Sequence, residues 1–287
     1  MILITGANGF IGKALAARLG KLAYPTVRSA IPGMHALDVT EEAQYADIPK
    51  EVTGVFHTVA KIPYKPDMSG REKEFERVNV DGTRLVAKFC RERDIKLVYS
   101  STCSVYGTPS ALPLPVTEEP LLDERELNLY AKTKLQGERI CETMPGLKYA
   151  TLRYSSVYGL GMSTNSVLPM FIDRAKKGQA LPVYGTGTRT QDFVCISDVA
   201  EANMQALALP SAEGTYNVGS GEPVSMLGLA SEIINVFGAD GCKIEMRFDG
   251  RPEGPDFSMD IGKAMRELHY RPHSLSWGLN EYRKALK

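Results

Sequence analysis

One glycine-rich stretch near the start of the chain, Thr5-Gly6-Ala7-Asn8-Gly9-Phe10-Ile11-Gly12, constrains the fold more than any other feature. Residues 1–5 form a short apolar run typical of a buried strand, and the apolar residues of 10–19 recur at helical spacing. Glycines at a strand-to-helix turn let backbone N–H groups approach a pyrophosphate, and the helix N-terminus adds donors and partial positive charge. The stretch therefore predicts a nucleotide-binding turn. The alternative is a turn without a ligand, because G-x-x-G-x-x-G differs from the standard G-x-G-x-x-G fingerprint.

Strand-like and helix-like segments alternate after this turn. Strands are predicted at 24–27, 55–60, 96–99 and 149–154, with a candidate strand end at 37–40, and helices at 71–93 and 129–143. This alternation is typical of βαβ units in an α/β fold with a doubly wound parallel sheet, which binds ligands at the carboxyl ends of its strands. Residues 108–120 hold four prolines and are expected to form an irregular loop.

The amino-acid composition of the sequence changes beyond residue 155. Segments 160–169 and 178–190 are rich in Gly, Pro, Ser and Thr and predict a smaller C-terminal lobe shaped by loops. A helix that begins near Ser197 and a segment at 215–218 return to the α/β alternation. A further helix, 225–237, is assigned to the smaller lobe.

Charge, apolar pattern and cysteine spacing argue against nucleic-acid binding, membrane insertion and secretion. Lys plus Arg and Asp plus Glu both total 34 among 287 residues, so no basic field favours nucleic acid or an anionic membrane. The start lacks the pattern of a secretory signal, and no apolar run approaches the ~18 residues of a membrane span. The five cysteines are scattered without a C-x-x-C pair, so we expect free thiols, no metal site and a cytoplasmic protein.

Two candidate catalytic residues, Tyr130 and Lys134, lie one helical turn apart in the predicted helix 129–143. Lowering a tyrosine pKa from about 10 to about 7 requires roughly 4 kcal/mol of phenolate stabilisation. A nearby ammonium and a cationic nicotinamide ring would supply it. The alternative is an ordinary exposed pair, because this spacing is common by chance.

A cluster of hydroxyl groups, Tyr99-Ser100-Ser101-Thr102-Cys103-Ser104, follows the strand predicted at 96–99. In an open parallel sheet a substrate would lie at this strand end. The Thr102 hydroxyl is placed to hydrogen-bond the oxygen on which Tyr130 acts. Alternatively, Thr102 caps the next helix.

Taken together, these segments resemble the extended short-chain dehydrogenase/reductases, in particular the NAD-dependent epimerase/dehydratase group that includes UDP-galactose 4-epimerase. The resemblance extends over almost the whole chain. The matching segments are Thr5–Gly12, Phe56–Ala60, Asn79–Thr83, Ser100–Gly107, Tyr130–Lys134, Leu152–Gly159, Val183–Gly187, Asp192–Val194, Asp198–Ala200 and Tyr216–Gly219.

The resemblance implies a Rossmann-like NAD(P)-binding domain in residues 1–155. It also implies a lobe in 156–287 that mainly closes over a nucleotide sugar, with some segments returning to the first domain. It assigns catalysis to Thr102, Tyr130 and Lys134: Tyr130 exchanges the proton, Lys134 contacts the nicotinamide ribose, and Thr102 holds the reacting oxygen.

Binding residues follow from the same resemblance and from the end of the second predicted strand. The predicted cofactor-binding residues are Gly6, Asn8, Gly9, Phe10, Ile11, Gly12, Arg28, Ser29, Asp38, Val39, Val59, Ala60, Lys61, Asn79, Ser100, Tyr130, Lys134 and Tyr154. The predicted substrate-binding residues are Lys61, Thr102, Ser156, Asn165, Arg189 and Arg251. Arginine suits a diphosphate because its fork binds anions in two places, although a loop arginine is more often simply solvated.

Several positions depart from the family pattern. Ser156 stands where Asn is frequent, and Gln191 where Arg is frequent, so Arg189 is expected to compensate in binding the diphosphate. Sugar 4,6-dehydratases carry an Asp-Glu pair where Cys103-Ser104 stands here. Without these carboxylates the elimination of water lacks its acid and base, which argues against dehydratase activity.

The end of the second predicted strand leaves the cofactor open between NAD and NADP. NAD enzymes commonly carry an acidic residue there, but this chain has Arg28-Ser29. An arginine there can pair with the 2′-phosphate of NADP, or stack on the adenine of NAD.

The leading hypothesis is a nucleotide-sugar epimerase acting on a UDP-hexose through a transient 4-keto sugar. The alternatives are a net reductase or dehydrogenase of a keto-sugar nucleotide or another small carbonyl compound, and a non-catalytic nucleotide sensor. The helices at 71–93 and 129–143 are similar to those that form a four-helix bundle between subunits in this family, so a homodimer is expected. Their apolar faces could instead be buried entirely on the sheet.

Overall fold

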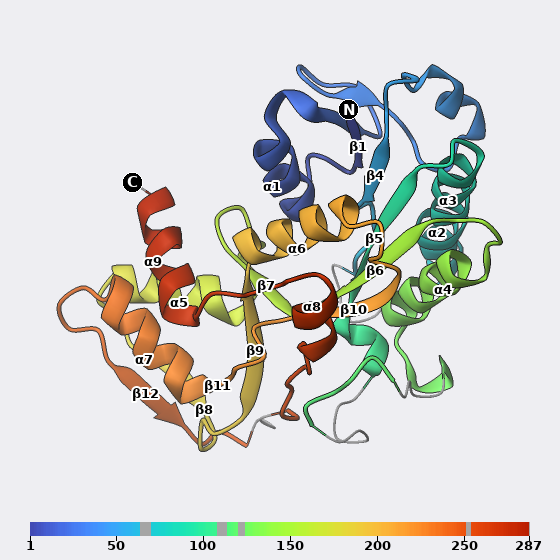
Figure 1. Cartoon of the computed structure of the whole chain (residues 1–287). Coiled ribbons are helices and arrows are strands. Elements are labelled where there is room, and N and C mark those ends of the chain that lie inside the picture. Colours follow the sequence, from blue (N-terminus) through green and yellow to red (C-terminus); the bar gives the residue numbers. More distant parts are fainter. Residues whose placement is uncertain (64–69, 108–113, 120–123, 251–253, 287) are drawn as a thin grey trace.

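The structure, a computed structural model, describes residues 1–63, 70–107, 114–119, 124–250 and 254–286. Figure 1 shows a larger part that holds the N-terminus and a smaller part that holds the C-terminal helix.

A parallel β-sheet is the frame of the larger part. Within the described residues it has seven strands in the order β10-β6-β5-β4-β1-β2-β3, and all neighbours are parallel. They are β1 (Ile2–Thr5), β2 (Ala23–Val27), β3 (His35–Ala36), β4 (Gly54–His57), β5 (Lys96–Thr102), β6 (Tyr149–Tyr154) and β10 (Gly214–Val218). The strand order reverses between β1 and β4, where doubly wound sheets bind their ligands.

Helices cover both faces of this sheet (Figure 1). Helices α1 (Phe10–Leu19) and α6 (Ile196–Ala208) pack on one face, and α3 (Gly82–Glu92) and α4 (Leu129–Thr143) on the other. Successive strand residues point to opposite faces, so Ile4 and Val98 belong to the first core whereas Leu3 and Leu97 belong to the second. This double burial explains the continuous apolar runs of the strands.

The smaller part has a core of its own. Among the described residues, β7 (Ser156–Tyr158), β9 (Thr190–Cys195) and β11 (Pro223–Ser225) form a sheet in the order β11-β9-β7, and β8 (Leu181–Tyr184) pairs with β12 (Ile244–Arg247). Helices α5 (Val167–Lys176), α7 (Met226–Phe237) and α9 (Leu275–Ala285) pack against these strands. The remaining elements are α2 (Glu72–Phe75), α8 (Gly262–Glu267), the 3-10 helices η1 (Gly20–Leu22), η2 (Glu42–Asp47), η4 (Cys103–Tyr106) and η6 (Glu124–Glu126), and the π-helix η3 (Glu76–Asp81).

The helix predicted at 129–143 is confirmed in full as α4. The Asn128 side chain accepts a hydrogen bond from the Ala131 N–H at 2.9 Å, which fixes the start of the helix. Pro145 lies two residues beyond its end. The segment 215–218 is confirmed as part of β10, which pairs with β6 in the large sheet.

Four predictions of local structure need correction. The helix predicted at 71–93 is interrupted by the π-helix η3 between α2 and α3. The loop predicted at 178–190 contains β8, which tolerates Pro182 because it pairs only with β12 in its sheet. The strand predicted at 55–60 ends at His57, and residues 37–40 follow β3 instead of ending a strand. Of the loop predicted at 108–120, residues 108–113 and 120 lie outside the described part.

Candidate active site

The glycine-rich turn brings the N-terminus of α1 against the end of β1. Gly6 has a φ of +71°, a conformation that side chains disfavour, and its carbonyl accepts a hydrogen bond from the Gly9 N–H at 2.9 Å. A Cβ on Gly12 would lie 2.3 Å from the Gly6 carbonyl oxygen. Glycine at both positions is therefore required by the backbone path, and the first N–H groups of α1 remain available as donors.

A cavity of about 380 Å³ opens beside this turn, at the ends of β1, β2 and β4. Predicted cofactor residues that line it are Gly6, Asn8, Gly9, Arg28, Asp38, Val39, Val59, Ala60 and Lys61. The cavity is also lined by Leu37, Thr58, Glu74, Arg77 and Val78, which sequence reasoning did not select. Thr58 lies within the matched segment 56–60, so this segment offered a signal, whereas nothing in the pattern singled out Arg77.

Opposite charges face each other across this cavity. Burial alone would raise the pKa of Asp38, but hydrogen bonds from the Thr40 N–H (3.0 Å) and hydroxyl (2.8 Å), with the charges of Arg77 and Arg28, lower it. Asp38 is thus an anion at neutral pH, close enough to Arg28 to offset part of its charge. Lys61 forms an ion pair with Glu74 at the edge of the cavity.

Three predicted cofactor residues are engaged inside the protein and do not line this cavity. Asn79 has no exposed surface; its amide bonds the backbone of Lys61 and the Thr133 hydroxyl. The hydroxyl groups of Ser100 and Tyr154 lie 3.1 Å apart, and Tyr154 also bonds Asn203 on α6. Tyr130 and Lys134 do not line this cavity either, so the assignment of these residues to the cofactor stays a prediction.

Tyr130 and Lys134 project from the first turns of α4 toward β5. Burial lowers the pKa of Lys134 to about 7, opposed by the negative charge of Glu138. Its ammonium lies 4.0 Å from the centre of the Tyr99 ring. Burial raises the pKa of Tyr130 to about 12, with a further rise from Cys103, while a hydrogen bond with the Thr102 side chain lowers it. The structure therefore brings Thr102 and Tyr130 together at the end of β5, while the Lys134 ammonium lies over the Tyr99 ring.

Thr102 also has the capping role considered as the alternative. Its hydroxyl oxygen accepts a hydrogen bond from the Ser104 N–H at 3.1 Å and so caps the 3-10 helix η4. The cap fixes the orientation of the Thr102 side chain beside Tyr130. Burial raises the pKa of the neighbouring Cys103 thiol to about 12, so this group stays protonated at neutral pH.

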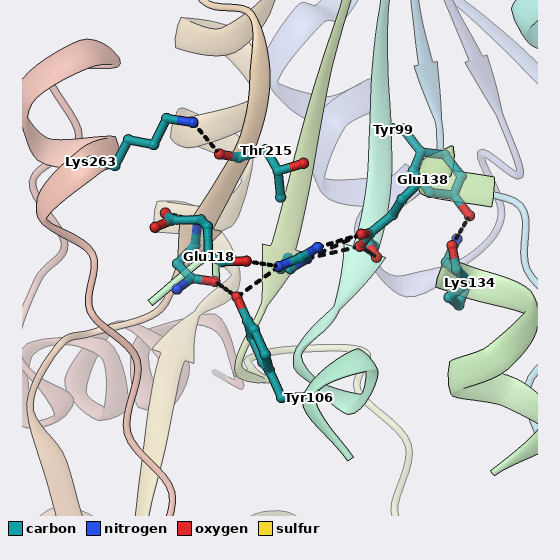
Figure 2. A network of polar contacts seen from close by, with 10 residues as sticks. Tyr99, Tyr106, Glu118, Lys134, Glu138, Thr215 and Lys263 are labelled. Atoms are coloured by element: carbon teal, nitrogen blue, oxygen red, sulfur yellow. Dashed lines mark hydrogen bonds and ion pairs between the residues drawn. The ribbon is translucent and has the colours of Figure 1, made fainter. Parts of the chain in front are cut away.

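A buried ion pair holds α4 against the sheet (Figure 2). The Glu138 carboxylate accepts hydrogen bonds from Arg153 on β6 at 2.6 and 3.0 Å and from the Ser101 hydroxyl. Arg153 also donates to the Tyr106 hydroxyl at 3.1 Å and to the Glu118 carbonyl at 2.8 Å. Because Ser101 precedes Thr102 and Glu138 lies two turns beyond Tyr130, this pair fixes α4 relative to β5.

At the end of β4, His57 is fully buried between two hydroxyl groups. Its ring nitrogens lie 2.7 Å from the Thr5 hydroxyl and 3.1 Å from that of Thr83. Burial, and then the charge of Lys134, lower the pKa of His57 to about 3. The ring is therefore neutral, and it ties the end of β1 to α3 through β4.

Three predicted substrate residues, Ser156, Asn165 and Arg189, line two adjacent cavities in the smaller part, whereas Lys61 lines the cavity at the glycine-rich turn and Thr102 lies at the end of β5. Ser156, Gln191 and Arg189 line a cavity of about 340 Å³, and Arg189 and Asn165 line another of about 420 Å³. Gln191 accepts a hydrogen bond from Arg189 at 2.7 Å and donates one to the Ser156 hydroxyl at 2.9 Å. Tyr184, which lies within the matched segment 183–187, and Met226, for which the sequence gave no signal, also line the cavity of about 420 Å³. Arg251 lies outside the described residues.

Other predicted cofactor residues, Phe10, Ile11, Gly12 and Ser29, lie next to the turn or the end of β2 but do not line the cofactor cavity. Gly12 acts through the close packing described above.

The five cysteines are free thiols. In the part of the chain that the structure describes, we find no cluster of potential metal ligands and no helix long and apolar enough to cross a bilayer.

Comparisons with known proteins agree with this geometry. The sequence profile of the NAD dependent epimerase/dehydratase family matches residues 2–219. A putative UDP-glucose 4-epimerase of Methanocaldococcus jannaschii is 30% identical over 295 residues, covering 95% of this chain and 93% of that protein. The structure of the Thermus thermophilus UDP-glucose 4-epimerase with NAD is 25% identical, with a TM-score of 0.77 over 99% of this chain and 97% of that chain. A UDP-N-acetylglucosamine 4-epimerase from Bacillus cereus, 24% identical, has the same fold, with a TM-score of 0.81 over 99% and 96% of the two chains. With more than half of its length matched, the chain belongs to the NAD dependent epimerase/dehydratase family.

Proposed function

We propose that this protein is an NAD(P)-dependent nucleotide-sugar epimerase of the UDP-hexose 4-epimerase type. One observation carries the proposal: the Thr102 and Tyr130 side chains are hydrogen-bonded at the end of β5, beside the strands whose ends line the cavity at the glycine-rich turn, and Lys134 lies one helical turn further along α4. The names of relatives support it, since both the archaeal and the Thermus proteins are named as UDP-glucose 4-epimerases.

The residues that line the cavity at the glycine-rich turn fit a dinucleotide. The turn at Gly6 and the N-terminus of α1 suit the pyrophosphate, because a Cβ at Gly6 would lie 3.0 Å from the Val59 side chain and close the approach. Asp38 is placed for the adenine edge and Arg28 for the adenosine ribose or a 2′-phosphate. When bound, the nicotinamide accepts a hydride from the sugar and later returns it.

Each catalytic side chain then has one task. Tyr130 takes the proton from the C4 hydroxyl of the sugar and gives it back to the 4-keto oxygen after the sugar has turned over. Thr102 donates a hydrogen bond that holds this oxygen in line. Lys134, held beside the Tyr99 ring, would contact the nicotinamide ribose.

We assign the two cavities of the smaller part to the nucleotide end of the substrate. The guanidinium of Arg189, oriented by Gln191, is placed to pair with the diphosphate. Accordingly, residues 1–155 bind mainly the cofactor and 156–287 mainly the substrate. We also propose a homodimer through α3 and α4, and a cytoplasmic location, which suits the free thiols.

The proposal is tested by incubating the purified protein separately with UDP-galactose and UDP-glucose. We expect each sugar to be converted into the other without added cofactor and without net change in NAD(P)H absorbance. Stoichiometric oxidation or reduction of the nicotinamide would instead identify a dehydrogenase or reductase. Loss of water from the sugar is not expected, because Cys103 and Ser104 offer no carboxylate.

Removing the Tyr130 hydroxyl distinguishes a catalytic role of this residue from a structural one. Tyr130→Phe is expected to lower kcat by at least a factor of about 100, because it removes the group that transfers the proton. Tyr282→Phe, on α9 in the smaller part, is the matched control and should keep full activity. Undiminished turnover by Tyr130→Phe would refute the assignment.

A further inference from the structure

The carboxylate of Asp192 lies where the two parts of the molecule are joined. Asp192 belongs to β9, the middle strand of the small sheet, and has no exposed surface. The chain passes between the large and the small sheet twice in this region, once between β6 and β7 and once between β10 and β11. Asp192 contacts both passages, although the proposed mechanism gives it no task.

The first passage consists of Ser155, the single residue between β6 and β7. Its hydroxyl donates to Asp192 Oδ1 at 3.0 Å. Its backbone N–H donates to the Val218 carbonyl at 3.1 Å and so continues the pairing of β6 with β10. Asp192 is thereby fixed to the point at which β6 leaves the large sheet.

The second passage is the turn between β10 and β11. Ser220 donates to Asp192 Oδ1 from its N–H at 2.7 Å and from its hydroxyl at 3.0 Å, and the Gly221 N–H donates to Oδ2 at 3.2 Å. A Cβ on Gly219 would lie 2.6 Å from Asp192 Oδ2. The close approach of the carboxylate therefore explains the glycine that ends the matched segment 216–219.

Residues of both proposed binding regions adjoin this carboxylate. Gln191 precedes Asp192 and Ser156 follows Ser155, and their side chains are bonded to each other in the substrate cavity. On the other side, Asp192 lies near enough to Cys103, the neighbour of Thr102, for its charge to add to the rise in the pKa of that thiol that burial causes. A shift of β9 would thus move the diphosphate residues relative to the catalytic hydroxyl groups.

We propose that Asp192 is a positioning residue that holds the substrate-binding strand β9 in register with the catalytic sheet by bonding both passages of the chain. The inference rests on the proposed function, in which one substrate contacts both parts. The inference concerns the alignment of the substrate. We expect cofactor binding, at the ends of β1, β2 and β4, to be unaffected.

The test compares Asp192→Asn with Asp198→Asn. Asparagine has one acceptor oxygen, so its NH₂ group must face the N–H of either Ser220 or Gly221. Asp198 is the matched control: it is also buried and accepts hydrogen bonds from His273, but it joins α6 to the segment before α9. Kinetics with UDP-glucose, binding of NAD by calorimetry, and hydrogen exchange are measured for both variants and the wild type.

We expect Asp192→Asn to raise KM for UDP-glucose at least about tenfold while the Kd for NAD changes less than about twofold, and Asp198→Asn to alter neither. Exchange should accelerate in 156–158 and 190–195 but not in β1 and β4. An unchanged KM, or equal losses in substrate and NAD binding, would overturn the inference. If Asp192→Asn does not fold, Ser220→Ala, which removes one donor, should change KM in the same direction.

Failure of the proposed function would be distinguishable from failure of this inference. If the wild type converts no UDP-sugar, the proposed function is wrong, and hydrogen exchange then decides the role of Asp192. Faster exchange confined to 156–158 and 190–195 in Asp192→Asn supports it, and unchanged or uniformly faster exchange rejects it.

Discussion

Replacing Glu138 with Gln would leave the Arg153 guanidinium buried without its carboxylate. The two side chains are only 5% and 4% exposed, so water cannot take the place of the lost partner. Arg153 would keep its hydrogen bonds to the Tyr106 hydroxyl and the Glu118 carbonyl, but its Nε and Nη2 would face a neutral amide. Removing one member of a buried ion pair typically costs about 3–5 kcal/mol. We therefore expect Glu138→Gln to lose about that much free energy of unfolding.

Urea unfolding followed by far-UV circular dichroism measures this loss. The double variant Glu138→Leu with Arg153→Met should recover at least about half of it, because apolar replacement of both partners removes the uncompensated charge. The matched control is Asp173→Asn, which breaks a pair with Lys177 at 2.7 Å whose side chains are 61% and 57% exposed. Exposed pairs contribute at most about 1 kcal/mol. A loss for Glu138→Gln no larger than that of Asp173→Asn would refute the reasoning.

Three further predictions concern the cofactor side of the molecule. Gly12→Ala should destabilise the protein by about 1–3 kcal/mol and weaken NAD binding, because the added methyl group overlaps the Gly6 carbonyl; urea unfolding and calorimetry check this against Lys13→Ala, and wild-type values would contradict it. The pKa of His57 is below that of a histidine in the unfolded chain, so protonation favours unfolding. The contribution of neutral His57 to the free energy of unfolding is complete above about pH 6.5 and decreases by about 1.4 kcal/mol per pH unit as the pH falls toward 3. Urea unfolding at about pH 7 and 4.5 should accordingly show a smaller loss for His57→Gln than for the wild type, and equal losses would reject the assignment. Arg28→Ala should weaken NADP binding at least about tenfold more than NAD binding, since only NADP has a 2′-phosphate; equal effects would place Arg28 on the shared part of the cofactor.

The sequence pattern predicted the order of strands and helices well where each segment is buried on both sides or begins with a clear cap. Strand β6 and helix α4 begin and end at the predicted residues. The weaker predictions fall where tertiary contacts override local composition. Proline at 182 suggests a loop, yet the segment pairs with β12. The π-helix η3 interrupts a continuous apolar periodicity that by itself predicts one regular helix.

For the candidate site, residue types and spacing by themselves identified the glycine turn and the approach of Thr102 to Tyr130, because helix periodicity and strand ends determine which side chains can converge. Only the tertiary structure decided which polar groups face the cavity and which are hydrogen-bonded inside the protein. Asn79 and Tyr154 form bonds inside the protein, whereas Thr58 and Arg77 line the cavity. The same holds for Asp192, whose partners at 155, 220 and 221 lie far from it in sequence. Such contacts depend on how the two sheets are packed, which local patterns do not encode.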